Sequence, residues 1–258
     1  MKIACLIKQV PDTETKIRIK SDASGIEDSG IKYIISPYCE FAVEEAIKTK
    51  EKNPGSETTV ITLGAERGIE ALRTALAMGI DKAVHIDSES KIFDSFTTAT
   101  VLAAAIKAGG FDIVFCGKQA IDLDNGQVAQ MVAELLDWPQ VMILEKIDFT
   151  ADKKGVVATR RVSGGAREIY EVALPALFGC EKGLNVPRYA SLPGIMKAKT
   201  KPVERLKSFD LLGGATPLIN FINYQLPPEK MAGKKLPGEP AQQAHDLVRL
   251  LREEAKII

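Results

Sequence analysis

The chain has 258 residues, of which 45% are hydrophobic and 26% are charged, and its formal net charge is zero. This composition is that of an ordinary globular protein, long enough for one large domain or two small ones. The balanced charge excludes a general attraction to nucleic acid, and no apolar run is long enough for direct membrane insertion. With no signal-peptide pattern after Met1, we expect a soluble, cytoplasmic protein.

The first half of the chain alternates predicted strands with predicted helices. Strands are expected at residues 3–7, 58–63, 83–86 and 113–116, with a short edge strand at 16–19. Helices are expected at residues 36–51, 69–79, 93–108 and 128–136, the first of them with Ser36 as N-cap. This alternation predicts an α/β fold with a doubly wound, mostly parallel sheet of the Rossmann-like type. Ligands bind such sheets at the carboxyl ends of the strands, where the loops after Ile7, Leu63 and Cys116 open.

The pattern changes after Trp138. Residues 141–149, 155–162 and 168–172 predict antiparallel strands, and a further apolar strand follows at 174–180. Residues 184–207 are strongly basic, residues 211–240 are rich in glycine and proline, and residues 239–258 predict an amphipathic helix. We therefore expect a nucleotide-binding α/β domain over residues 1–207, followed by a C-terminal arm and helix over residues 208–258.

Four widely spaced cysteines and two histidines leave little room for metal or disulfide chemistry. The cysteines are Cys5, Cys39, Cys116 and Cys180, with no CxxC pair. Their spacing favours a reducing compartment and argues against a metal site. His85 and His245 lie in no ligand or triad spacing, so both are interpreted as structural or surface groups.

Recognised catalytic motifs are missing from the sequence. It contains no GxxxxGK[ST] and no complete GxGxxG, which excludes a P-loop hydrolase and a standard nicotinamide dehydrogenase. The acidic pair Glu44–Glu45 on the first predicted helix is expected to form a solvated face. Lys8 and Asp12 flank the loop after the first strand, close to the expected ligand crevice.

The segment 117–127 joins a buried strand to the start of a helix and is rich in Gly, Asp and Asn. Free N–H groups at a helix N-terminus attract anions, and Gly126 would let a phosphate approach the backbone. Asp124 or Asn125 is expected to cap the helix. Taken alone, this pattern fits either a nucleotide site or an ordinary connecting loop.

Four segments in the same order resemble the β subunit of electron transfer flavoproteins. They are residues 7–13 (IKQVPDT), 36–46 (SPYCEFAVEEA), 117–122 (GKQAID) with 136–140 (LDWPQ), and 184–199 (LNVPRYASLPGIMKAK). The resemblance extends from Met1 to about Lys207, and it is more specific than any single motif.

The resemblance implies a heterodimer in which an α subunit holds the redox FAD and this subunit binds an AMP. It places the nucleotide contacts at Leu6, Ser36, Pro37, Tyr38, Cys39, Leu63, Gly117, Lys118, Gln119, Ala120, Ile121, Asp122, Leu123, Asp124, Asn125, Gly126, Gln127 and Val128. Backbone amides of 125–128 would hold the phosphate, and Asp122 would orient the loop or meet a ribose hydroxyl. Lys8, Asp12 and Thr13 would lie near the partner's flavin. The chain would then be an electron-carrier subunit rather than a stand-alone catalyst.

The resemblance also implies docking of acyl-CoA dehydrogenase-type flavoenzymes through a recognition loop at residues 180–202. Leu192 would be the exposed anchor, ringed by Arg188, Lys197 and Lys199. Spacing alone instead favours a Leu192 packed beneath the loop. Electrons would pass on to an electron-accepting oxidoreductase linked to membrane quinone, and the arm and helix would pack on the α subunit.

Two alternatives remain open. Residues 11–13 and the pair Gln127–Val128 look more like an electron-bifurcating branch of the family, in which a second FAD replaces AMP. The recognition segment and residues 136–140 look like the AMP branch. The other alternative is a free-standing adenine-nucleotide-binding module of the universal-stress or adenylating-enzyme type. It would need neither the α subunit nor a flavin.

Overall fold

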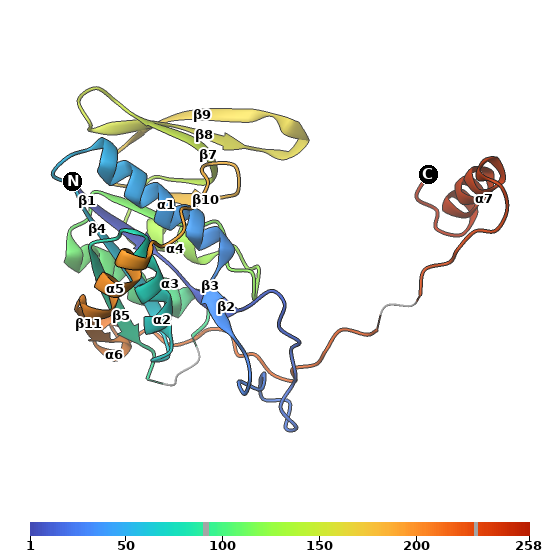
Figure 1. Cartoon of the computed structure of the whole chain (residues 1–258), viewed down its shortest axis with the longest axis horizontal. Helices are drawn as coiled ribbons and strands as arrows, with labels where there is room; N and C mark the ends of the chain where they lie inside the picture. The colour runs from blue at the N-terminus through green and yellow to red at the C-terminus, as the bar shows by residue number, and fades with distance from the viewer. Residues whose placement is uncertain (90–92, 230–231) are drawn as a thin grey trace. The chain divides into compact units, whose positions relative to one another are not determined.

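The computed structural model describes residues 1–89, 93–229 and 232–258, and these form one nine-stranded sheet and one two-stranded sheet (Figure 1). The large sheet comprises β1 (Lys2–Leu6), β4 (Glu57–Gly64), β5 (Lys82–Asp87), β6 (Ile113–Gly117), β7 (Gln140–Phe149), β8 (Gly155–Arg161), β9 (Arg167–Ala173), β10 (Ala176–Cys180) and β11 (Val203–Lys207). Its order is β11-β5-β4-β1-β6-β10-β7-β8-β9. Pairing is parallel from β11 to β7 and antiparallel from β7 through β8 to β9.

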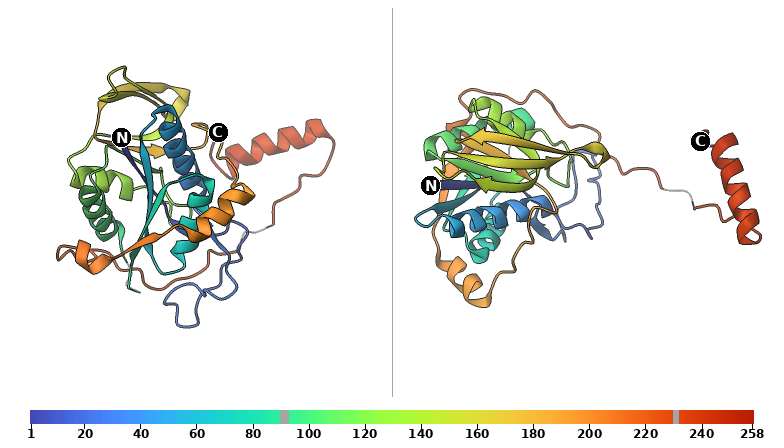
Figure 2. Two further views of the ribbon diagram at one scale, coloured as in Figure 1. Left: turned by 60° about the vertical axis from the view of Figure 1, so that its left-hand side comes forward. Right: turned by 90° about the horizontal axis from the view of Figure 1, so that it is seen from above.

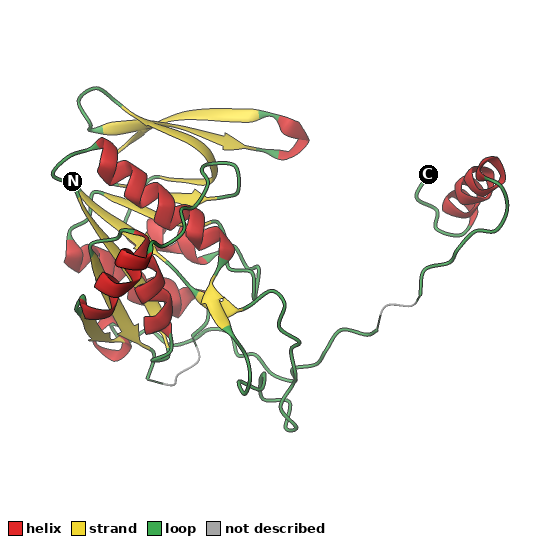
Figure 3. Cartoon of the chain, in the orientation of Figure 1, coloured by secondary structure: helices red, strands yellow, loops and turns green. Residues whose placement is uncertain are grey.

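Helices cover both faces of this sheet, as the red ribbons of Figure 3 show. They are α1 (Pro37–Lys52), α2 (Gly68–Met78), α3 (Ser95–Gly109), α4 (Val128–Leu135), α5 (Leu192–Thr200) and α6 (Ser208–Leu211), with a 3₁₀ turn at Ser163–Gly165. Strand residues alternate between the faces: Ile3 and Cys5 of β1 pack toward α1 and α2, whereas Ala4 and Leu6 pack toward α3 and α4. The predicted doubly wound α/β fold with an antiparallel extension is confirmed.

The order in which strands are added to the sheet reverses at β1. The chain runs from β1 outward to β4 and β5, and then returns to place β6 on the other side of β1. The carboxyl ends of β1, β4 and β6 therefore meet at a topological switch point, the place where ligands bind in open sheets of this class.

Contacts divide the chain into two compact units. The first comprises residues 1–17 and 27–222, and the second residues 18–26 and 223–258. Within the second unit, α7 (Pro240–Glu253) has no buried residue, and Leu247 and Val248 are exposed. Figure 2 shows α7 in two further views. No helix among the described residues is long and apolar enough to cross a membrane.

Several local predictions differ from the structure. The predicted strand at 16–19 is only a single bridge between Ile19 and Ile26. The third helix begins at Ser95 rather than residue 93, because Asp94 is its N-cap. Sequence patterns missed the short antiparallel pair β2 (Gln9–Pro11) and β3 (Tyr33–Ile35), and also α5 and β11. The strands have only three to five residues, too few for a period to be detected, and α5 buries only Ala198, so it has no apolar face that a sequence pattern could reveal.

All four cysteines are free and buried. Burial raises the pKa of each thiol. The thiols therefore remain protonated and serve as apolar packing groups.

Candidate functional site

A cavity of about 300 Å³ lies at the switch point. Leu6 of β1, Leu63 of β4 and Cys116 of β6 bring the three strand ends to it. The predicted residues that line it are Leu6, Lys8, Cys39, Leu63, Gly117, Lys118, Gln119, Ala120, Leu123, Asn125, Gly126, Gln127 and Val128. Most of the nucleotide residues predicted from the sequence thus surround one space.

Other predicted site residues do not line the cavity. Ser36, Pro37, Tyr38, Ile121, Asp122 and Asp124 are not among the lining residues, nor are Asp12 and Thr13. Ser36 is the buried N-cap residue of α1, as predicted, but its side chain makes no cap hydrogen bond. Pro37 does occupy the first turn of α1, where its missing N–H costs no intrahelical bond.

Gly117 brings α1 against the end of β6. A Cβ at this position would lie 2.9 Å from the backbone nitrogen of Cys39 and from the carbonyl carbon of Tyr38. Only glycine permits this approach without displacing the backbone. The contact places Cys39 on the cavity wall beside the strand end.

The loop 117–127 is held by its own side chains. The Lys118 backbone N–H donates to the Cys180 carbonyl over 2.9 Å, and Lys118 Nζ lies 2.8 Å from Glu181 and over the Tyr38 ring. Gln119 Nε2 donates to Asp124 Oδ1 over 2.8 Å, with Asp124 in the left-handed region (φ 50°). These bonds fix the path of the loop independently of a bound ligand.

The first turn of α4 has no side-chain cap. Its N-cap is Gln127, which makes no side-chain cap bond, and Asp124 instead accepts from Gln119. The prediction that Asp124 or Asn125 caps this helix is therefore wrong. The consequence is favourable for ligand binding, because the first N–H groups of α4 have no carboxylate or amide acceptor and carry the positive end of the helix dipole.

Charged residues beside the cavity are paired. Lys8 Nζ lies 2.7 Å from Asp122 Oδ2, and the Asp122 carboxylate also accepts from the Leu123 backbone N–H. Asp12 lies beyond β2, where Lys32 donates to it over 2.8 Å. The hydrogen bond from Lys32 lowers the pKa of Asp12, so its carboxyl group is ionised at neutral pH.

Asp94 and Phe221 also line the cavity, and sequence reasoning missed both. Asp94 is 4% exposed and caps α3, accepting from the Thr97 backbone N–H over 2.8 Å and from the Thr97 hydroxyl over 2.6 Å. Burial alone would raise the pKa of Asp94, but the hydrogen bonds that it accepts lower it. Asp94 could have been recognised from the sequence as a helix N-cap, because an aspartate before a helix is a common cap. Nothing in the sequence around Phe221 indicates that this residue lines the cavity.

Residues 180–202, the recognition segment, lie on the α1 and α2 side of the sheet. Leu192 is the first residue of α5 and is 74% exposed, whereas Ala198 of the same helix is buried. Ser191 caps α5 by accepting from the Gly194 backbone N–H, and Gly194 has no room for a Cβ against the Ala77 carbonyl oxygen. Lys197 and Lys199 are exposed on the last turn.

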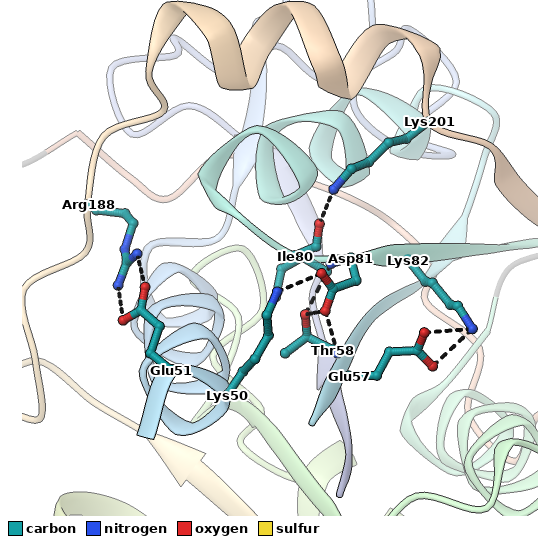
Figure 4. Close-up of polar contacts among 9 residues, drawn as sticks. All are labelled: Lys50, Glu51, Glu57, Thr58, Ile80, Asp81, Lys82, Arg188 and Lys201. Atoms are coloured by element: carbon teal, nitrogen blue, oxygen red, sulfur yellow. Dashed lines mark hydrogen bonds and ion pairs between the residues drawn. The ribbon is translucent and has the colours of Figure 1, made fainter. Parts of the chain in front are cut away.

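Ion pairs and hydrogen bonds secure both ends of this segment (Figure 4). Near its start, the Arg188 guanidinium donates two bonds of 2.9 Å to Glu44 and two bonds, of 2.6 and 3.1 Å, to Glu51. At its end, Lys201 Nζ donates to the Ile80 carbonyl over 2.6 Å. The guanidinium of Arg188 is therefore paired with two carboxylates of α1.

The acidic pair Glu44–Glu45 corrects another prediction. Both residues are 4% exposed rather than solvated. Glu44 is neutralised by Arg188, and Glu45 accepts from the Asn185 amide over 2.9 Å. Their partners lie about 140 residues later in the chain, so neighbouring sequence carried no sign of this burial.

Comparisons with known proteins agree with this architecture. Residues 24–211 match the family described as "Electron transfer flavoprotein domain". The chain is 45% identical over 263 residues to a Bacillus subtilis protein named electron transfer flavoprotein subunit beta, with 100% of each chain covered. It is 37% identical over 258 residues to the mitochondrial protein of that name from Arabidopsis thaliana, again with full coverage of both. For the Homo sapiens protein, identity is 38% over 260 residues, covering 100% of this chain and 99% of the relative.

Proposed function

Because the chain belongs to the electron transfer flavoprotein β-subunit family, we propose that it is the β subunit of a heterodimeric electron carrier. In this proposal an α subunit holds the redox FAD, and the β subunit binds AMP and helps to house that flavin. The flavin supplies the electron chemistry when bound, and this chain contributes binding and surroundings. The full-length similarity to proteins named as subunits favours this assembly over a free-standing nucleotide module.

The observation that carries the nucleotide proposal is the switch-point cavity with the uncapped start of α4 on its wall. The N–H groups of residues 125–128 suit a phosphate, which accepts hydrogen bonds and is attracted by the helix dipole. Apolar side chains such as Leu6, Leu63 and Leu102 line the space and suit the faces of a base. About 300 Å³ lies at the lower end of the usual range for ligand pockets, which favours a mononucleotide over a dinucleotide.

Gln127→Glu tests the phosphate position with little change in shape. Gln127 is exposed and lines the cavity, so a carboxylate there would repel a phosphate held at the start of α4. The same carboxylate favours the helix dipole, so stability is expected to hold or rise slightly. We expect nucleotide affinity to fall at least tenfold at low salt, with no fall in the melting temperature of the nucleotide-free complex. Unchanged affinity would refute the placement of the phosphate.

Lys8, Asp12 and Thr13 are proposed to lie near the flavin of the α subunit. Lys8 and Asp12 are each held by an opposite charge, Asp122 and Lys32, which fixes their positions before the α subunit binds. The arm and α7, within residues 208–258, are proposed to pack on that subunit. The unburied apolar residues of α7, such as Leu247 and Val248, support this role.

The recognition segment is proposed to dock acyl-CoA dehydrogenase-type flavoenzymes, from which electrons pass to a membrane quinone-linked acceptor. Leu192 supplies an exposed anchor, and Lys197 and Lys199 supply positive charge around it. Arg188 contributes by holding the start of the segment against α1.

Leu192→Ala tests this docking surface. We expect a loss of about tenfold in the rate of electron transfer from the dehydrogenase at subsaturating carrier, with the flavin content unchanged. Ile169→Ala is the matched control, because Ile169 of β9 is similarly exposed but lies outside the recognition segment. Equal rates for the two variants would refute the anchor.

An electron-bifurcating subunit with a second FAD remains the second candidate. The residues that favour it are Thr13 and the pair Gln127–Val128, of which Gln127 and Val128 line the cavity. A purified complex with FAD rather than AMP in this cavity would favour the bifurcating subunit.

A further inference from the structure

The arm that follows α6 is hydrogen-bonded to the carboxylate of Asp94, which lines the cavity. Asp94 Oδ2 accepts hydrogen bonds from the backbone N–H of Leu218 over 2.7 Å and of Ile219 over 3.2 Å. Two residues later, Phe221 lines the same cavity as Asp94. Leu218 and Ile219 have exposed side chains, and their backbone bonds to Asp94 tie this stretch to the start of α3.

Asp94 divides its two oxygens between two tasks. Oδ1 caps α3 through Thr97, and Oδ2 holds the arm. A carboxylate is the side chain that can accept at both places at once, because each oxygen has two acceptor sites and neither carries a proton. A serine would retain a cap but would lack the second acceptor.

Phe221 is the least exposed of the large apolar residues in this stretch of the arm. Its exposed fraction is 39%, against 57% for Ile219, 73% for Leu218 and 76% for Ile222. Its ring adds apolar surface to a cavity whose other walls come from the strand ends, the loops that follow them and helices α1, α3 and α4. Residues 208–222 group with the α/β unit, and residue 223 begins the second unit.

We propose that Asp94 pins the start of the C-terminal arm across the nucleotide cavity, so that Phe221 closes one wall and nucleotide retention depends on arm closure. This inference rests on the proposed nucleotide function of the cavity. Coupling of this kind is reciprocal: a bound nucleotide that contacts the closed wall stabilises the pinned arm, and a pinned arm slows nucleotide release. Asp94 is a positioning residue here, and Phe221 is the group that contacts the ligand.

The experiment compares variants of the full chain co-purified with its α subunit, with AMP as the probe. Asp94→Ser retains the cap and removes the arm acceptor, and Phe221→Ala removes the ring and leaves Asp94 intact. Thr97→Val is the matched control, since it removes the hydroxyl bond to Oδ1 and keeps both arm bonds. AMP release rates, melting temperatures and hydrogen exchange of the 218 and 219 amides are measured for each.

We expect Asp94→Ser and Phe221→Ala each to release AMP roughly fivefold to fiftyfold faster, from the loss of charge-assisted hydrogen bonds or of ring contact. Thr97→Val should lower the melting temperature but release AMP at nearly the wild-type rate. In the wild type, AMP should slow exchange of the 218 and 219 amides, and Asp94→Ser should abolish that protection. A purely structural role would change the melting temperature without this nucleotide-dependent protection.

Wild-type AMP release by both Asp94→Ser and Phe221→Ala would overturn the inference while leaving the nucleotide site intact. A wild-type complex that binds no nucleotide at all would overturn the proposed function and this inference together. The two failures are therefore distinguishable.

Discussion

Arg188→Ala should destabilise the α/β unit more than the loss of any exposed ion pair. Arg188 donates to Glu44 through Nε and Nη2, and Glu44 is 4% exposed, so the substitution leaves a buried carboxylate without its cation. Breaking a buried pair by removing one partner costs roughly 3–5 kcal/mol, and we expect about 2–4 kcal/mol because Arg188 itself is partly exposed. For a chain of this length that corresponds to a fall of about 5–12 °C in melting temperature.

The control for this prediction is Arg205→Ala. Arg205 also donates two hydrogen bonds to a single carboxylate, that of Glu66, at 2.8 and 2.7 Å, but both side chains are exposed. Exposed pairs contribute about 0.2–1 kcal/mol, so this variant should melt within about 3 °C of the wild type.

A second variant distinguishes a buried unpaired charge from a simple loss of contacts. Adding Glu44→Gln to Arg188→Ala removes the buried charge, so the double variant should be more stable than Arg188→Ala alone. Thermal and urea unfolding followed by circular dichroism provide the measurement. Equal melting temperatures for Arg188→Ala and Arg205→Ala would contradict this prediction. So would a double variant that is less stable than Arg188→Ala alone.

Three further predictions concern packing and pH. Gly117→Ala should cost about 1–3 kcal/mol and lower nucleotide content, because its Cβ would lie 2.9 Å from the Cys39 backbone nitrogen; unfolding curves and bound nucleotide equal to wild type would contradict it. Burial raises the pKa of Asp81, but hydrogen bonds from Lys50 and Thr58 outweigh this and lower it below 3.8. Its contribution to stability is thus present above pH 3.8 and is lost as the pH falls further, and Asp81→Asn should flatten acid unfolding in that window. In Gly194→Ala, the new Cβ would collide with the Ala77 carbonyl oxygen and displace α5. Electron transfer from the proposed dehydrogenase partner should then be slower while the flavin stays bound, and stopped-flow rates equal to wild type would argue against it.

The layers of the fold were predictable because the central strands are short, mostly apolar runs between helices of clear period. Helix α4 and the loop before it were predicted from the same local pattern. In contrast, the capping of α4 was predicted wrongly because Asp124 has a competing partner, Gln119, within the loop. Propensity identifies which residues can cap a helix, but the fold of the loop decides which of them do.

Long-range contacts explain the rest of what the sequence did not reveal. Arg188 pairs with the buried Glu44, and Asp94 on the cavity wall accepts a hydrogen bond from the backbone of Leu218. In each case the partners are more than a hundred residues apart. No local period or propensity encodes such pairs, so only the folded chain shows them.

The nucleotide content of the purified complex distinguishes a subunit that binds AMP from one that holds a second FAD. The chain is co-expressed with its α subunit, the complex is denatured, and released FAD and AMP are quantified by chromatography. We expect one FAD and one AMP per heterodimer, and less AMP in the Gln127→Glu complex, whose affinity for the nucleotide should be at least tenfold lower. Two FAD and no AMP would contradict it and assign the cavity at the ends of β1, β4 and β6 to a second flavin.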